Sequence, residues 1–415
     1  MLQVSKIRCF EAAVTDSLKR IIAFAALMVF LCLPATALVN EYFGLPGVAV
    51  YFAAAAVILL IIFRFRGTLR NIARAGYPVL VGLFAVGLLA VFAIVYPMET
   101  SGKFSLGGDR DEMLNLSVRA LFEGRYPYDE LTPLGNEISV LPGSIFLAAP
   151  FVALGNAAFQ NFFWVILLLV VTSLFLKGKA SALIAVAAVL LLSPAVQYEY
   201  ISGGDVLANS IFVLVFFYLA IRAFSNPGIS VWLKIAAGIA LGVALASRAN
   251  FLLLLPLLFG VLYRKAGWKP ALAAVLTAGV VAGAVTLPFY LRDPAMFPPI
   301  VNANKLVLYD ARFPNASSII ILAAAALSVL LAVFLARKPE QDPEPAFYWT
   351  SAVVQLFPML CGLVLDTIIT GSVDFKIMHD RYGLMFLFFG LWGCWPYLFR
   401  KETSAEIKPP PMRHT

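Results

Sequence analysis

Charged residues are scarce in this sequence, and histidine and cysteine are scarcer still. Only 13% of its 415 residues are charged, 61% are hydrophobic, and the mean hydropathy is +0.89. One soluble core cannot hide that much apolar surface, so the composition predicts a polytopic, all-α membrane protein. The chain contains only two histidines, which is too few for a histidine-based metal centre to be expected. The four cysteines are scattered along the chain, which indicates neither a disulfide framework nor a thiolate metal site.

The basic residues give a net charge of +8 without forming a nucleic-acid surface. They fall in short clusters between apolar runs, such as Arg64 to Arg74, Lys177 and Lys179, and Arg264 to Lys269. Cytoplasmic loops of membrane proteins show this pattern. We therefore expect a lipid bilayer rather than nucleic acid as the surroundings, the bacterial inner membrane as the location, and both termini on the cytoplasmic side.

About twelve apolar runs are predicted to cross the bilayer. A signal peptide ending near Ala35 is the alternative for the first run, but the long preceding segment with Glu11 and Asp16 favours an uncleaved span. Residues 1–401 would then form one membrane domain, and 402–415 a disordered cytoplasmic tail. The predicted runs are Ile21 to Val39, Gly47 to Phe63, Pro78 to Tyr96, Phe159 to Leu176, Ala180 to Val196, Val206 to Ala220, Val231 to Ala246, Phe251 to Tyr263, Ala271 to Pro288, Ser318 to Ala336, Ala346 to Leu365 and Gly383 to Leu398.

One loop, residues 97–141, holds eight of the 23 acidic residues and is placed on the extracytoplasmic side by this topology. Within it, residues 109–123 are predicted to form an amphipathic surface helix, with Leu114, Val118, Leu121 and Phe122 along one stripe. The run that follows, Leu141 to Leu154, is too short to span and contains two prolines. We expect it to be a half-inserted helix whose backbone is satisfied by protein or by a water-filled cavity.

The order of motifs in and after this loop resembles a known enzyme family. Gly107-Gly108-Asp109-Arg110-Asp111-Glu112 precedes the helix, Gly124-Arg125-Tyr126-Pro127-Tyr128 follows it, and Leu141-Pro142-Gly143 opens the short apolar run. This arrangement is similar to the first extracytoplasmic loop of GT-C fold glycosyltransferases. Weaker similarities are Leu192-Ser193-Pro194 to Gly203-Gly204-Asp205 and His379-Asp380-Arg381-Tyr382. The resemblance implies transfer of a sugar, with inversion, from a polyprenyl-phosphate donor to a glycan or lipid acceptor outside the cytoplasm.

The resemblance suggests Asp111 as the base that takes the acceptor proton, with Asp109 as second choice. A capping box with Glu112 is the alternative for Asp109. Asp205, Glu112 and Glu199 are candidates for acceptor or metal contacts, although Asp205 also fits a helix N-cap. Asp109, Asp111 and Asp205 together would suit Mg²⁺ or Mn²⁺, which the resemblance does not require.

The candidate partners of the donor phosphate are Arg248, Arg381, His379 and Lys305. Arg248 is the most informative, because it lies between apolar stretches where a charge is expensive and a guanidinium matches phosphate oxygens. Snorkelling to the interface is the alternative explanation for it. Two rival functions remain: a transporter or lipid flippase, which predicts charges deep within spans, and a polymerase or ligase of surface polysaccharide.

Overall fold

The computed structural model describes residues 2–100, 109–295, 297–301, 305–337, 342–379 and 381–399. Regular structure within these ranges is helical, and strand-like pairing is limited to an antiparallel bridge between Leu131 and Glu137. Gly107, Gly108, Asp380 and the expected tail 402–415 lie outside the described residues. The helices are α1 (Leu2–Cys32), α2 (Thr36–Arg64), α3 (Arg66–Ala75), α4 (Tyr77–Thr100), α5 (Arg110–Phe122), α6 (Pro142–Ala153), α7 (Phe159–Phe175), α8 (Lys179–Leu192), α9 (Pro194–Ile201), α10 (Asp205–Ser225), α11 (Val231–Leu245), α12 (Leu255–Ala266), α13 (Trp268–Tyr290), α14 (Pro298–Val301), α15 (Ala316–Arg337), α16 (Pro343–Thr370) and α17 (Leu384–Phe399), with short 3₁₀ segments between some of them.

Seven helices of the described chain are long and apolar enough to cross a membrane. They are the continuous stretch Ser17–Arg64, Tyr77–Glu99, Asp205–Ser225, Ala249–Ala266, Trp268–Tyr290, Ala316–Arg337 and Pro343–Thr370. An eighth candidate is the pair α8 and α9, which bends by 85° at Ser193 before Pro194. The first stretch contains two of the predicted spans, because Gly44 leaves the helical conformation inside α2 (φ 65°). The other predicted crossings fall on the shorter apolar helices α7, α11 and α17.

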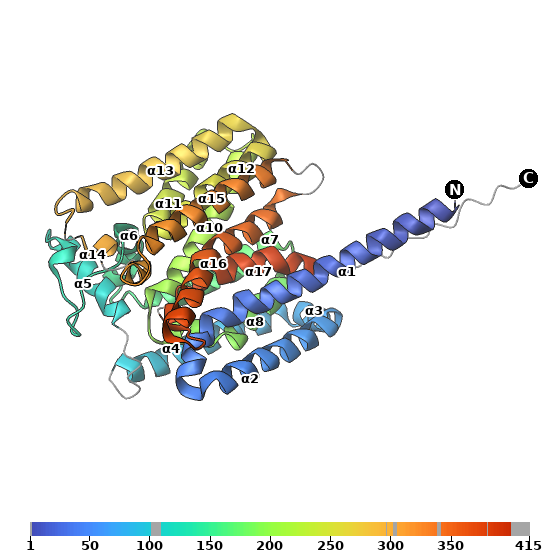
Figure 1. The fold of residues 1–415 in the computed structure, drawn as a ribbon, viewed down its shortest axis with the longest axis horizontal. Helices are drawn as coiled ribbons and strands as arrows, with labels where there is room; N and C mark the ends of the chain where they lie inside the picture. Colours follow the sequence, from blue (N-terminus) through green and yellow to red (C-terminus); the bar gives the residue numbers. More distant parts are fainter. Residues whose placement is uncertain are drawn as a thin grey trace, which may run out of the picture.

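Helix α10 is the centre of the bundle. It packs against α7, α11, α12 and α17 (Figure 1). In its most apolar stretch, 83% of the residues are buried inside the protein. Apolar residues occur all round it, as expected for a helix surrounded by other helices. Its first residue is Asp205, so the most deeply enclosed helix begins with a carboxylate.

The helices at the periphery carry large apolar side chains on their outer faces. Val79 on α4 is 66% exposed, Val280 on α13 67% and Leu322 on α15 69%. Contiguous apolar surface of this kind is found where a protein meets lipid or a partner. Together with the length of these helices, it supports a multi-pass protein in a bilayer.

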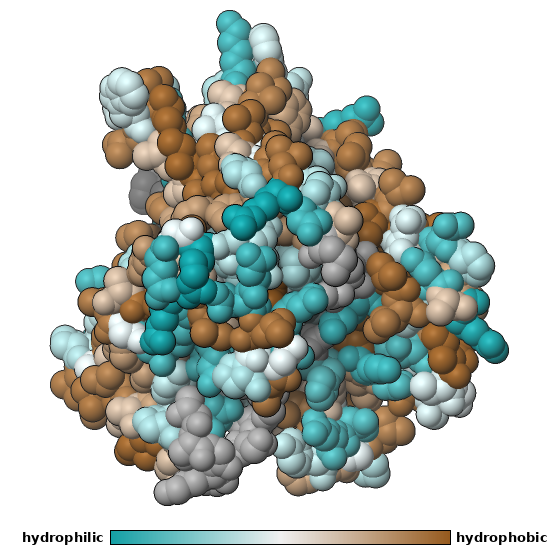
Figure 2. Space-filling view, turned by 90° about the vertical axis from the view of Figure 1, so that its left-hand side faces the viewer, coloured by the Kyte–Doolittle hydropathy of each residue, from teal (hydrophilic) through white to brown (hydrophobic). Residues whose placement is uncertain are grey.

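One end of the bundle carries a second, smaller core formed by α5, α6 and the segments beside them. Met113, Leu114 and Val118 of α5 pack there with Tyr128 and Phe297. The expected stripe is thus largely buried against protein, while its last member, Phe122, is 59% exposed. This end is seen face on in Figure 2, where hydrophilic residues gather across the middle and lower part of the surface.

Candidate active site

Asp111 lies on the first turn of α5 with its carboxylate turned into the protein. Only 3% of the residue is exposed, and its Oδ2 accepts a hydrogen bond of 2.5 Å from the Tyr96 hydroxyl near the end of α4. Asn156 donates to that same hydroxyl at 2.8 Å. Burial raises the pKa of the Asp111 carboxyl, the hydrogen bond from Tyr96 opposes this rise, and the negative charge of Asp109 adds to it. Asp111 is therefore a carboxylate of increased basicity held in one orientation.

Gly203 and Gly204 allow the turn before α10 to approach this carboxylate. Gly203 has a φ of 71°, and a Cβ on it would lie 2.8 Å from the Tyr96 ring and 3.1 Å from the Cβ of Asp111. A Cβ on Gly204 would lie 2.3 Å from Oε2 of Glu199. The two glycines are needed for close packing against the site's own side chains.

Asp205 is fully buried, and its carboxylate forms ion pairs with two arginines. Its Oδ2 lies 2.5 Å from Nη2 of Arg248, and its Oδ1 lies 3.2 Å from Nη1 of Arg110. Asn209, one turn further along α10, donates to Oδ2 at 2.8 Å. Gly204 is the N-cap and Asp205 the first helical residue, so the alternative role of Asp205 as a helix N-cap is wrong. Its side chain is engaged by cations, which offset the large cost of burying a charge.

Arg248 is positioned by the short helix α6. The Gly143 N–H donates to the Ala246 carbonyl at 2.9 Å, and the Ser144 hydroxyl donates to the Ser247 carbonyl at 3.3 Å. A Cβ on Gly143 would lie 2.2 Å from the Val243 carbonyl oxygen, so this contact requires glycine. The N-terminus of α6 therefore holds in place the short break between α11 and the 3₁₀ segment that starts at Ala249. Arg248 lies in this break and is 9% exposed.

Glu199 and Arg381 form a second buried ion pair. Glu199 is fully buried in α9, and its Oε1 lies 2.5 Å from Nε of Arg381. Its Oε2 accepts the backbone N–H of Val206 at 3.1 Å, so Glu199 satisfies a donor at the N-terminus of α10. Arg381 has a φ of 58°, which is unfavourable for a residue with a Cβ. Local strain of this kind is characteristic of functional sites.

Two tyrosine rings lie beneath the guanidinium groups. The Tyr382 ring is 5.3 Å from the Arg248 guanidinium and 5.8 Å from that of Arg110. The Tyr198 ring is 4.1 Å from the Arg381 guanidinium. These cation–π contacts hold the arginines in place.

No protein-family model matches this chain, and neither a curated protein nor a solved structure matches it.

The structure thus brings together residues from four separate stretches of the sequence: Asp111, Glu199 with Asp205, Arg248 and Arg381. In the described structure they form a contiguous buried cluster at the end of the bundle that carries α5. Glu112 follows Asp111 and is exposed at the surface. Partial desolvation by the neighbouring protein, and then the negative charges of Asp111 and Asp109, raise its pKa.

Asp109 stands apart from the cluster. It occupies the N-cap position of α5 but makes no side-chain capping bond, so the capping box with Glu112 is absent. Its carboxylate instead accepts hydrogen bonds from Thr132 and, at 2.9 Å, from Asn136 of the following loop. No three acidic, histidine or cysteine side chains of the described residues form a metal-binding group. Asp109, Asp111 and Asp205 therefore do not share a ligand set there.

His379 and Lys305 also fall outside the cluster, since both are exposed and neither takes part in its ion pairs.

Three residues of the cluster were not predicted from the sequence: Tyr96, Arg110 and Tyr382. Tyr96 is the last residue of a predicted span, and a single tyrosine hydroxyl at that position forms no recognisable sequence motif. Arg110 did have a sequence signal, because it is a single cation between Asp109 and Asp111. In the structure its side chain is 15% exposed and pairs with Asp205.

Proposed function

We propose that this protein is a GT-C-type membrane glycosyltransferase that moves a sugar from a polyprenyl-phosphate donor to a glycan or lipid acceptor. The observation that carries the proposal is the buried Asp111 beside two arginine–carboxylate pairs at one end of the helical bundle. In the proposed topology twelve segments cross the inner membrane of a bacterium, both termini are cytoplasmic, and this end faces outward. Helix α5 lies at that surface, and α6 enters the membrane only part of the way.

In the proposed reaction Asp111 acts as general base. Its carboxylate accepts the proton of the acceptor hydroxyl while that oxygen forms a bond to C1 of the sugar. The bond between C1 and the phosphate oxygen breaks, and its electron pair leaves with the phosphate. Attack from the face opposite the phosphate inverts the configuration at C1. The Tyr96 hydrogen bond fixes which carboxylate oxygen faces the acceptor.

Arg248 and Arg381 supply positive charge for the departing phosphate in this proposal. Each guanidinium has five N–H donors, and the ion pairs with Asp205 and Glu199 use only part of that capacity. Among the described residues, the Nε–H of Arg248 is buried without an acceptor. A phosphate oxygen would satisfy it, and pre-oriented donors of this kind stabilise charge that develops during reaction.

A specific observation favours a transferase over a transporter. Asp205 is the first residue of α10, Arg248 lies between α11 and α12, and Arg381 precedes α17. The charges thus lie at the end of the bundle that carries α5 (Figure 1), whereas a transporter would place its substrate charges near the middle of the spans.

The direct test is to incubate the purified protein with a panel of polyprenyl-phosphate sugars and to measure release of polyprenyl phosphate. We expect Asp111→Asn to abolish release and Asp109→Asn to retain most of it, since Asp109 is bound to the following loop. Arg248→Gln should raise the apparent KM for the donor more than that for the acceptor. The proposal fails if no donor is consumed or if Asp111→Asn is as active as the unaltered protein.

A further inference from the structure

A second charged site lies at the opposite end of the molecule. A pocket of about 210 Å³ is lined by Arg70, Arg74, Tyr77, Gly178, Lys179, Ala180 and Ser181. Tyr77 is the first residue of α4, whereas Tyr96 near the other end of the same helix belongs to the candidate active site. A helix rises about 1.5 Å per residue, so the two sites are roughly 30 Å apart, close to the thickness of a hydrocarbon core.

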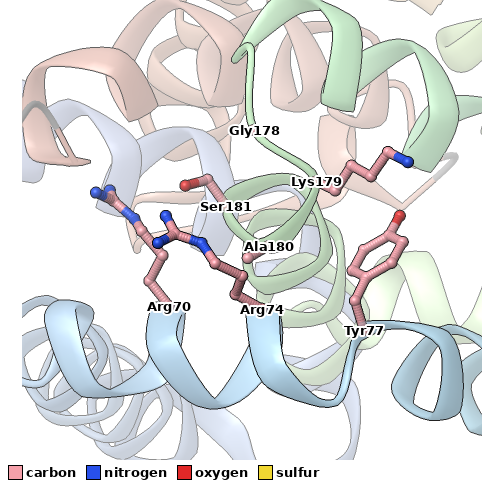
Figure 3. Close-up of a pocket in the computed structure, with 7 residues that line it drawn as sticks. All are labelled: Arg70, Arg74, Tyr77, Gly178, Lys179, Ala180 and Ser181. Atoms are coloured by element: carbon pink, nitrogen blue, oxygen red, sulfur yellow. The ribbon is translucent and has the colours of Figure 1, made fainter.

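The pocket is formed where two helices face each other. Arg70 and Arg74 project from α3 toward the segment that opens α8, and Tyr77 projects toward Lys179 (Figure 3). Arg70 is anchored, since its Nη2 donates to the carbonyl of Phe399 at 2.8 Å. Arg74 and Lys179 are exposed. Lys179, Ala180 and Ser181, which begin α8, line the same pocket, and a helix N-terminus favours anions.

Among the residues that the structure describes, nothing neutralises the positive charge of this pocket. Within the described ranges, no carboxylate forms an ion pair with Arg70, Arg74 or Lys179. Burial, followed by repulsion from Arg74 and Arg66, lowers the pKa of Arg70. The Nε–H of Arg70 is buried without a partner there. An anion entering the pocket would relieve this repulsion and satisfy that donor.

The surroundings of the pocket indicate that the anion comes from a lipid. Helix α3 joins α2 to α4, and both of these helices expose apolar side chains such as Leu60 (51%) and Leu83 (64%). On α3 itself Ile72 is 59% exposed, while the basic residues line the pocket. A short amphipathic helix between two such segments is expected at the level of the headgroups.

We propose that this pocket binds the phosphate of an anionic glycerophospholipid headgroup, on the membrane face opposite the candidate active site. The inference is independent of the proposed glycosyltransferase activity, because it uses none of the residues of that site. Arg70, Arg74 and Lys179 would each donate to phosphate oxygens, and the Ser181 hydroxyl is a further donor within the pocket wall.

The test is to measure lipid binding to the delipidated full-length protein by native mass spectrometry. Phosphatidylglycerol, phosphatidylcholine and inorganic phosphate are compared. The unaltered protein should prefer phosphatidylglycerol. Arg74→Gln/Lys179→Gln should weaken this binding about 25-fold, because each basic side chain near an anionic headgroup contributes a factor of about five. Both side chains are exposed, so this double variant should fold. The charge-conserving variant Arg74→Lys/Lys179→Arg should bind phosphatidylglycerol about as tightly as the unaltered protein.

The matched control is Arg64→Gln/Lys177→Gln, which removes the same charge from the same face but from residues outside the pocket. It should retain binding within about twofold, less than the factor of five for one pocket cation. Equal weakening by both double variants would mean that only general surface charge attracts the lipid, and the proposal would be overturned. It would equally be overturned if phosphatidylcholine or inorganic phosphate bound as tightly as phosphatidylglycerol.

Discussion

Replacement of Asp205 by Asn should destabilise the protein more than loss of any surface charge. The side chain of Asp205 is fully buried, while those of its partners Arg248 and Arg110 are 10% and 15% exposed. Asn keeps the shape of Asp but carries no charge, so two nearly buried guanidinium groups would face each other without an anion. Removal of one member of a buried ion pair costs about 3–5 kcal/mol, and we expect a loss of this size in the free energy of unfolding.

The assay is reversible unfolding of the purified protein in mixed micelles, followed by circular dichroism. Glu123→Gln is the control, because it breaks the ion pair between Glu123 and Arg125, whose side chains are 59% and 51% exposed. Exposed pairs contribute little to stability, so this control should change it only slightly. Addition of Arg248→Met to Asp205→Asn should recover part of the loss, since one uncompensated cation is removed. If Asp205→Asn is no less stable than Glu123→Gln, the buried charges are not coupled as described.

Two further substitutions test the surroundings of Asp111. Tyr96→Phe removes a hydrogen bond that lowers the pKa of Asp111, so the pKa of this carboxyl should rise. Because a base must be deprotonated to act, the acidic limb of the kcat/KM profile should move to higher pH. An unchanged profile would contradict the role of Asp111. Gly203→Ala places a Cβ against Tyr96 and Asp111, whereas Gly124→Ala has the same φ of 71° and open space around it. Thermal unfolding and turnover should therefore be impaired much more by Gly203→Ala than by Gly124→Ala, and equal effects would show that only backbone strain matters.

The helical class and the positions of the long apolar helices could be predicted because length and hydropathy are local properties of the chain. The helix over 110–122 was also predictable, since Gly124 and Pro127 end it. The identity of charge partners was not. Asp205 and Arg248 are 43 residues apart in sequence, and Glu199 and Arg381 lie 182 apart. Such pairs are decided by how helices pack, which hydropathy does not encode.

The capping alternatives for Asp109 and Asp205 fail for a related reason. Asp109 and Asp205 both precede or open a helix, which makes an N-cap the expected local role. In the structure Asp109 is bound by the loop at Thr132 and Asn136, and Asp205 by arginines from other segments. Glu199, six residues before Asp205, provides the acceptor for the helix N-terminus instead. Tertiary contacts thus overrode a local preference of about 1 kcal/mol, the usual contribution of an N-cap.

All the charged members of the candidate active site stand at helix ends or in the short breaks between helices. Arg110 and Asp205 open α5 and α10, Arg248 precedes a 3₁₀ segment, and Arg381 lies just before α17. New ligand preferences could therefore evolve by exchanging a few turn residues, while the lipid-facing scaffold stays unchanged. The bundle would serve as a constant frame on which substrate recognition diversifies.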